Sequence, residues 1–422
     1  MSESTSTSTS IFASTVASAG SIASAPPNAF APPAPPAAQS PTMYYVGLDV
    51  HLKRSSICIL DAHGKQVKRL EVKGHWPAVL AEIQSRVPRP FAICYEASCG
   101  YGYLYERLAP IARHVSVAHP AQLRLICKSK KKNDKVDAAK LAKLLYLDMV
   151  PQVHVPRVDV RAWRALITYR HRLMDKRVAI KNQIRALLRG LGIAADVPAG
   201  KRLWSGTGIK WLKEQQLAEP DALRRDLAIE ELDEMNVKLK RVEKELNRRA
   251  DAHPGVTLLK TIPGVGVRTA EAMVAWIDDV SRFARNKHVG SYFGLVPCQD
   301  ASAAKNRLGH ITKDGPPVVR KLLCEAGWQG TRRSAAIRAY FERVMRNDPD
   351  RKKIALVATA HHLARVMAAM LRTGEAWRAD EPTTTAPTQC RPTAIGSDQI
   401  RNGKDGCAGG DSASPPRKTA VA

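Results

Sequence analysis

The pattern of apolar and polar positions predicts a strand-rich first half and a helical second half. Five short apolar runs predict β-strands, at residues 43–50, 55–61, 66–73, 91–96 and 114–118. Short turns join the first three runs, which predicts an antiparallel meander. Helical spacing near 76–87 and 101–111 separates the later runs, so these strands should add in parallel. The pattern therefore predicts an α/β domain with a mixed sheet.

Helical periodicity dominates the chain after residue 156. Apolar residues recur at intervals of three and four through 157–190, which predicts one long helix. A stricter heptad pattern follows within 222–250, at Ala228, Leu232, Met235, Leu239, Val242 and Leu246. This seam predicts either an oligomerising coiled coil or a hairpin that packs on the 157–190 helix of the same chain. Residues 256–374 are predicted to be all-helical.

Composition adds a strong positive charge to this picture. The 422 residues carry a formal charge of +27, with a pI near 10.0, which attracts phosphate backbones without regard to sequence. The charge is concentrated, because residues 157–189 hold ten Lys or Arg against two Asp. We therefore expect this helix to contact nucleic acid. The arginines predicted to make that contact are Arg161, Arg164, Arg172 and Arg185.

Shifts in composition predict the domain boundaries. The Ser/Thr/Ala/Pro-rich leader 1–42 and the polar tail 376–422 are expected to be disordered. Between them we expect an α/β domain at 43–155, a basic helix and coiled coil at 156–252, and a helical domain at 253–375. No apolar run approaches a membrane-spanning length, the leader is a poor signal peptide, and the eight cysteines show no paired spacing. These features indicate a cytoplasmic protein without a membrane partner.

Four acidic residues stand out against the basic background. Asp49 and Glu96 end predicted strands, and Asp134 and Asp137 open a predicted helix. Carboxylates from several elements are suitable ligands for a pair of divalent cations, which promote phosphodiester chemistry. Asp49 and the pair Asp134 and Asp137 also have simpler explanations. A strand-end Asp can bond to nearby backbone, and acids in a first helical turn favour the helix dipole.

Other segments suggest contact with nucleic acid. Lys128, Lys130, Lys131 and Lys132 precede the second acidic pair. Gly264 and Gly266, in the run TIPGVGVRTA, indicate a helix-hairpin-helix whose backbone can approach a phosphate. Ser302 lies among small residues, with Lys305, Arg307 and Lys313 after it. A serine in such surroundings can be a nucleophile if its proton is removed, although a loop serine flanked by alanines is usually inert.

Five motifs occur in order along this chain: GLDVHLK, YEAS, NDKVDA, TIPGVGVRTA and GLVP…GHITKDGPPVVRKLL. Together, in this order, they resemble the DEDD-type insertion-sequence transposases, a family guided by a bridge RNA. The resemblance covers roughly residues 43–374. It implies a ribonuclease-H-like (RuvC-like) domain in which Asp49, Glu96, Asp134 and Asp137 bind two Mg²⁺ ions. It also implies a C-terminal transposase domain whose serine, here Ser302, forms a covalent link to DNA.

Taken with this resemblance, the sequence predicts a DNA transposase, a metal-dependent recombinase that cuts and rejoins strands. The expected partners are DNA, a guide RNA and further copies of the same chain. Two alternatives stay open. A RuvC-like junction nuclease would use metal and water only, without Ser302. A non-catalytic, basic nucleic-acid-binding protein would show no dependence on a divalent metal.

Overall fold

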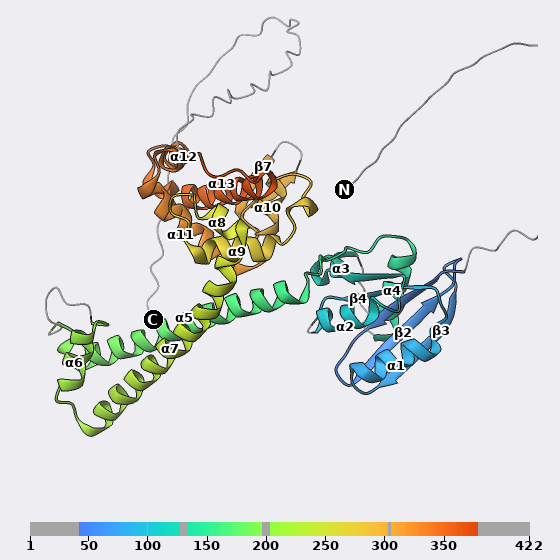
Figure 1. The fold of residues 1–422 in the computed structure, drawn as a ribbon, viewed down its shortest axis with the longest axis horizontal. Helices are drawn as coiled ribbons and strands as arrows, with labels where there is room; N and C mark the ends of the chain where they lie inside the picture. Colours follow the sequence, from blue (N-terminus) through green and yellow to red (C-terminus); the bar gives the residue numbers. More distant parts are fainter. Residues whose placement is uncertain (1–41, 99, 127–133, 196–202, 303–304, 379–422) are drawn as a thin grey trace, which may run out of the picture. The chain divides into compact units, whose positions relative to one another are not determined.

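The computed structural model describes residues 42–98, 100–126, 134–195, 203–302 and 305–378 (Figure 1). The predicted disorder of the leader and the tail concerns residues that fall almost wholly outside this description. The chain divides into two compact units, residues 1–161 and 162–422. Each is described below by itself, and the finer five-part division stays a prediction.

The first unit contains the mixed sheet that the apolar pattern predicts. Its strand order is β3-β2-β1-β4-β5. β1 pairs antiparallel with β2, and β2 with β3, whereas β4 and β5 add in parallel. All five predicted strands and their directions are therefore confirmed. The strands are β1 (Tyr44–Asp49), β2 (Arg54–Leu60), β3 (Gln66–Lys73), β4 (Phe91–Glu96) and β5 (His114–Ala118).

Helices cover both faces of this sheet (Figure 1). The helices α1 (Trp76–Arg86) and α2 (Tyr101–Leu108) bury Val79, Ile83 and Leu104 against one face. The helix α4 (Asp134–Tyr146) buries Leu141 and Leu145 on the other face, and the short α3 (Pro120–Ile126) packs there through Leu123. Apolar side chains on both faces explain why the central strands are nearly continuous apolar runs.

Two long helices of 33 residues each, α5 (Val158–Gly190) and α7 (Glu219–Asp251), are joined through α6 (Gly206–Glu214). They pair antiparallel, because Ile184 of α5 clusters with Leu232 of α7, and Arg170 of α5 bonds to Glu243 of α7. The heptad seam is turned into this pair, with Leu232, Leu239 and Leu246 all buried. Of the two alternatives for the seam, the structure supports the hairpin within one chain.

The rest of the second unit is a helical core. Its central helix, α13 (Lys352–Thr373), is long and apolar enough to cross a membrane by length and composition, contrary to the sequence expectation. It buries Leu363, Met367 and other apolar side chains inside this core, which accounts for its composition. The helices are α8 (Pro254–Leu259), α9 (Val267–Ile277), α10 (Lys287–Tyr292), α11 (Pro317–Arg333), α12 (Ala335–Met345) and α13 (Lys352–Thr373).

One carboxylate is enclosed in this core. Glu271 of α9 is fully buried and accepts a hydrogen bond from Arg268, at 2.8 Å, through Oε1 only. Burial raises the pKa of Glu271 to about 7, against the opposing effect of the Arg268 and Arg170 charges. The neighbouring residues of α9 are buried as well, so this helix is held on all sides.

The all-helical prediction for residues 256–374 is wrong at one place. An antiparallel hairpin of β6 (Pro297–Ser302) and β7 (Lys305–Ile311) stands between α10 and α11. Its described side chains are mostly exposed, including Cys298, Asp300 and Leu308. Without a buried face the strands carry little of the apolar alternation by which strands are recognised. The hairpin also contains Ser302.

Candidate active site

Two of the predicted acids lie side by side at one edge of the sheet. In the parallel pair of β1 and β4, Leu48 is opposite Tyr95, and the next residues are Asp49 and Glu96. Paired residues of parallel strands point to the same face. Cys94, two residues before Glu96, packs in a cluster with Leu141 of α4. Asp49 and Glu96 therefore both point to the face that α4 covers, at the carboxyl ends of adjacent strands.

Helix α4 begins at the same edge of the sheet. Its last residue, Tyr146, packs edge-on against Tyr45, with ring centroids 5.3 Å apart. Its first turns lie over Gly47, where a Cβ atom would be 2.0 Å from the carbonyl oxygen of Ala138 and 2.4 Å from the amide nitrogen of Ala142. The helix thus runs antiparallel to β1. Only glycine allows this approach, which brings the start of α4 to the strand ends.

The position of Asp137 at this edge follows from the same geometry, because Asp137 immediately precedes Ala138. Its Oδ1 is 3.0 Å from Nζ of Lys140, and its side chain is about one-third exposed. Oδ2 of Asp49 is 3.4 Å from Nε2 of His51, and the Asp49 side chain is only 16% exposed. Each of these two acids therefore has a neighbouring group that can carry positive charge. Asp134 is the first residue of α4, one turn before Asp137, and its side chain lies outside the described residues.

The donor set fits a hard divalent cation, because carboxylate oxygens from two strand ends and one helix start face the same edge. Among the described side chains, no three His, Cys, Asp or Glu are close enough to form a metal cluster. Asp134 is not part of that comparison. The acids are therefore gathered at one edge but not drawn together around one point.

We expect Gly47→Ala to destabilise the protein by about 1–3 kcal/mol, as overpacking does in a close-packed core. The new methyl group would meet backbone atoms of α4, so the helix start must move away from β1. Urea unfolding measures the loss. Gly190→Ala is the matched control, because nothing lies within 4 Å of that position. Equal stability of the two variants would show that α4 does not depend on the contact at Gly47.

Ser302 is the last residue of β6, and the structure pairs it with Lys305 across the hairpin. Arg307 is opposite Asp300 in the same ladder. The side chains of Ser302 and Lys305 lie outside the described residues, whereas Arg307 is exposed. Lys313 follows the hairpin with a left-handed backbone, at φ 58°. Ser302 thus ends the first strand of a hairpin whose second strand carries Lys305 and Arg307.

Arg320 of α11, which the sequence analysis missed, holds the base of this hairpin. Its Nη1 donates to the carbonyl oxygens of Phe293, Asp314 and Gly315, at 3.3, 2.5 and 3.0 Å. One guanidinium therefore joins the segment before β6 to the segment after β7. Nothing in the local sequence PPVVRKLL distinguishes Arg320 from an ordinary surface arginine of a helix.

The arginines predicted to contact nucleic acid fall into two groups. Arg161 pairs with Glu106 and donates to the carbonyl of Pro156, and Arg164 donates to the carbonyls of Ala275 and Trp276. Both therefore have structural roles within the protein. Arg172 and Arg185 are exposed and available to a ligand. Lys128, Lys130, Lys131 and Lys132 lie outside the described residues.

The glycine-rich turn joins α8 to α9 as the sequence predicts, but its two glycines differ. At Gly264, with φ 93°, a Cβ atom would be 2.4 Å from the amide nitrogen of Gly330 in α11. Gly264 is therefore required for packing between helices. Gly266 precedes α9 and has nothing within 4 Å of its Cβ position. A phosphate contact at this turn stays a prediction, and Gly266 is the better placed of the two.

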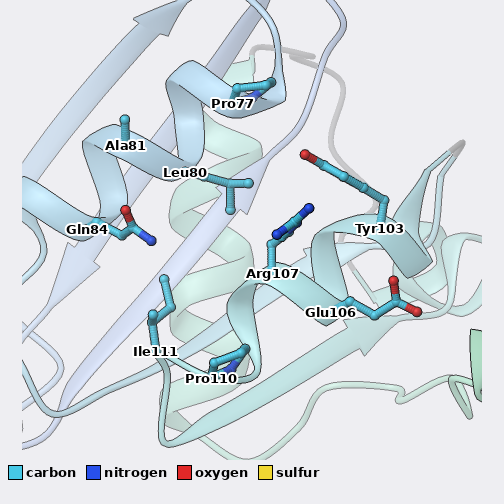
Figure 2. Close-up of a pocket in the computed structure, with 9 residues that line it drawn as sticks. All are labelled: Pro77, Leu80, Ala81, Gln84, Tyr103, Glu106, Arg107, Pro110 and Ile111. Atoms are coloured by element: carbon cyan, nitrogen blue, oxygen red, sulfur yellow. The ribbon is translucent and has the colours of Figure 1, made fainter.

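A separate depression of about 440 Å³ lies between α1 and α2 (Figure 2). Its lining includes Leu80 and Gln84 of α1 and Tyr103, Glu106 and Arg107 of α2. These helices cover the sheet face opposite α4. The depression is therefore on the other side of the sheet from Asp49 and Glu96, and it does not belong to the acidic edge.

Comparison with known families covers both units. A transposase profile of the DEDD type matches residues 46–193, which include all four predicted acids. The profile of the transposase IS116/IS110/IS902 family matches residues 256–342, which include the glycine-rich turn and the β6–β7 hairpin. The chain belongs to this family of insertion-sequence transposases. The family resemblance inferred from the sequence motifs is thereby confirmed.

Named relatives of this transposase agree with that assignment. The transposase for insertion sequence element IS1111A of Coxiella burnetii is 27% identical over 290 residues, which is 66% of this chain and 75% of the relative. The transposase for IS1328 of Yersinia enterocolitica is 27% identical, over 68% of this chain and 83% of the relative. The pilin gene-inverting protein of Moraxella bovis is 29% identical, over 46% and 54%.

Proposed function

We propose that this transposase cuts and rejoins DNA strands with a carboxylate site for Mg²⁺ and with Ser302 as the nucleophile. The observation that carries the proposal is the contact of α4 with Gly47, which brings Asp137 to the edge where Asp49 and Glu96 end their strands. An oxygen-only site of this kind suits phosphoryl transfer better than redox or acyl chemistry. The family assignment supplies DNA as the substrate.

Four carboxylates would hold the metal, those of Asp49, Glu96, Asp137 and Asp134. Bound there, Mg²⁺ would activate an attacking oxygen and stabilise the leaving one. The protein's own part is to fix where these carboxylates stand. Asp49 and Glu96 are on rigid paired strands, and Asp137 is on a helix that packs directly on one of them. Lys140 offsets part of the negative charge of Asp137 when no cation is present.

Ser302 would supply the covalent step. Its Oγ attacks a DNA phosphorus, the bond from phosphorus to one bridging oxygen breaks, and a phosphoserine link forms. The proton of the serine hydroxyl passes to the leaving oxygen, which becomes the hydroxyl end of the cut strand. A hydroxyl end from another strand then attacks the phosphoserine, which restores Ser302 and joins the strands. Such a step needs an activated serine, and Lys305 and Arg307 add positive charge near the phosphate.

Three partners belong to this proposal. DNA is the substrate, a guide RNA selects the site, and further copies of the chain complete the assembly. The charge of +27 supports binding of polyanions such as DNA and RNA. Because the heptad seam is buried within one chain, assembly into an oligomer would use other surfaces.

The proposal is tested by strand exchange reconstituted from purified protein, donor and target DNA, and RNA transcribed from the element. Exchange should require Mg²⁺ and should stop when a chelator removes it, because the carboxylates alone do not activate the attacking oxygen. Omitting the RNA should stop exchange as well. Binding of duplex DNA, measured in parallel, is the control and should persist without RNA.

Each omission has an outcome that contradicts one part of the proposal. Full exchange in the presence of the chelator would contradict the metal site. Full exchange without RNA would contradict the role of a guide RNA. DNA binding without any cleavage under all conditions would favour the basic nucleic-acid-binding protein.

A further inference from the structure

Three cations form a row along one face of α5. Arg177, Lys181 and Arg185 are spaced four residues apart, so they lie one above another on the helix. The ring of Trp204, in the segment before α6, lies against two of them. Nζ of Lys181 is 4.9 Å from the ring centroid, and the guanidinium carbon of Arg185 is 5.2 Å from it. We call Arg177, Lys181, Arg185 and Trp204 the Trp204 cluster.

The positive charge of this cluster is not neutralised within the described part of the chain. None of its three cations forms an ion pair with a described carboxylate, whereas Arg170, two turns earlier on α5, pairs with Glu243. Arg185 donates only to the neutral amide oxygen of Asn182, at 3.1 Å. Nε of Arg177 is buried and has no hydrogen-bond partner. Among the described residues, the charge of the row therefore has no carboxylate to balance it.

Crowding of like charges is unfavourable, and Lys181 shows its effect. Burial lowers the pKa of Lys181, and the neighbouring charges of Arg177 and Arg185 lower it further. Like charges four residues apart also destabilise a helix. A row of solvated surface cations would spread apart to reduce this repulsion. Here Trp204, which packs on the apolar cluster around Ile184 and Leu212, keeps Lys181 and Arg185 together.

The start of α6 adds to the positive potential beside the cluster. The helix begins at Gly206, two residues after Trp204, and Ser205 caps it by accepting a hydrogen bond from the amide of Gly208. The space at the Cβ position of Gly206 is open. An anion that meets the cluster would therefore also be close to a helix N-terminus, which favours negative charge.

We propose that the Trp204 cluster binds the phosphodiester backbone of a nucleic acid. A phosphate would balance the charge of the row and relieve the repulsion among the three cations. The inference rests on the proposed function for its ligand class. It adds a contact at the α6 end of the α5–α7 pair, outside the acidic edge and the β6–β7 hairpin.

The test compares two triple variants that remove the same charge. The first variant removes the row and combines Arg177→Gln, Lys181→Gln and Arg185→Gln. The control variant combines Lys240→Gln, Arg241→Gln and Lys244→Gln. It removes three exposed cations of α7 that no aromatic ring of the described residues contacts. Binding of a 30-nucleotide RNA and of a 30-base-pair DNA is followed by fluorescence anisotropy at several salt concentrations. Circular dichroism checks that both variants fold.

The first variant should lower the salt dependence of binding by about two to three units, because each lost phosphate contact removes close to one unit. The control variant should lower it by less than one unit. The polymer with the larger loss, RNA or DNA, is the one that the cluster binds. Equal slopes for both variants and the wild type, with both polymers, would overturn the proposal.

Crosslinking gives a second and local readout. Probes that carry 5-bromouracil are irradiated with the wild-type protein and digested with trypsin, which releases residues 203–210 with Trp204 as one peptide. We expect an adduct on this peptide, and its loss in the first variant only. Adducts confined to other peptides would contradict the proposal.

Failure of this inference can be separated from failure of the proposed function. A wild-type protein that binds neither polymer would contradict both. A wild-type protein that binds and exchanges strands, while the first variant behaves like the control, would contradict the Trp204 cluster alone.

Discussion

Replacing Asp49 with asparagine should abolish strand exchange while leaving DNA binding intact. The amide has the shape of the carboxylate and suits the same half-enclosed place at the end of β1, where Asp49 is 16% exposed. What it removes is the negative charge that a divalent cation requires of its ligands. Substitutions beyond the direct ligands already cost 10- to 100-fold in metal sites, so we expect a loss on the order of 100-fold or more.

The exchange rate is measured at saturating DNA, with Asp175→Asn as the matched control. Asp175 is an acid of α5 whose side chain is 69% exposed. Its Oδ1 is 3.5 Å from Nζ of Lys321. Its replacement should leave the rate within about a factor of two, as expected for a surface ion pair. If Asp49→Asn exchanges strands at the wild-type rate with Mg²⁺, the carboxylates at this edge are not metal ligands.

Replacing Ser302 with alanine should remove both the covalent adduct and the recombination. The substitution takes away only the attacking oxygen, at a position that already has alanines on either side. Metal-binding carboxylates would remain, so DNA binding should be unchanged. The adduct is measured on a denaturing gel, with a nicked DNA substrate that traps the protein on the cut strand.

Ser291→Ala is a suitable control, because Ser291 is exposed on the neighbouring α10. An adduct that survives Ser302→Ala would place the nucleophile on another residue. Cleavage by the wild type without any adduct would instead favour the junction nuclease, in which water attacks the phosphorus.

The sheet could be predicted because its central strands β1, β2 and β4 are largely buried and all its strands are separated by distinct turns or helices. Asp49 and Glu96 could be assigned to strand ends for the same reason. The contact between α4 and β1 could not be predicted, since nothing in the sequence tells that Gly47 leaves space for the backbone of Ala138 rather than for a turn. That contact is what relates Asp137 to the two strand acids.

Other features depend on tertiary partners that a single sequence does not reveal. Arg161 and Arg164 looked like their exposed neighbours on α5, but they bond to carbonyl groups of Pro156, Ala275 and Trp276. The heptad seam of α7 predicts that the helix packs on an apolar partner but does not identify it. In the structure the partner is α5 of the same chain. The described side chains of the β6–β7 hairpin are mostly exposed, so its pattern lacked the burial that marks the central strands β1, β2 and β4.

The length of α7 sets a distance scale along nucleic acid. Its 33 residues span about 50 Å at 1.5 Å per residue. Its first turns lie near the α6 end, and its last turns adjoin α8 and the glycine-rich turn. A duplex touching both ends would cover about 15 base pairs at 3.4 Å per step, or about one and a half helical turns. If both contacts lie on one side of a straight duplex, the extra half turn between them places the minor groove at one contact and the major groove at the other, so the two ends would meet different grooves.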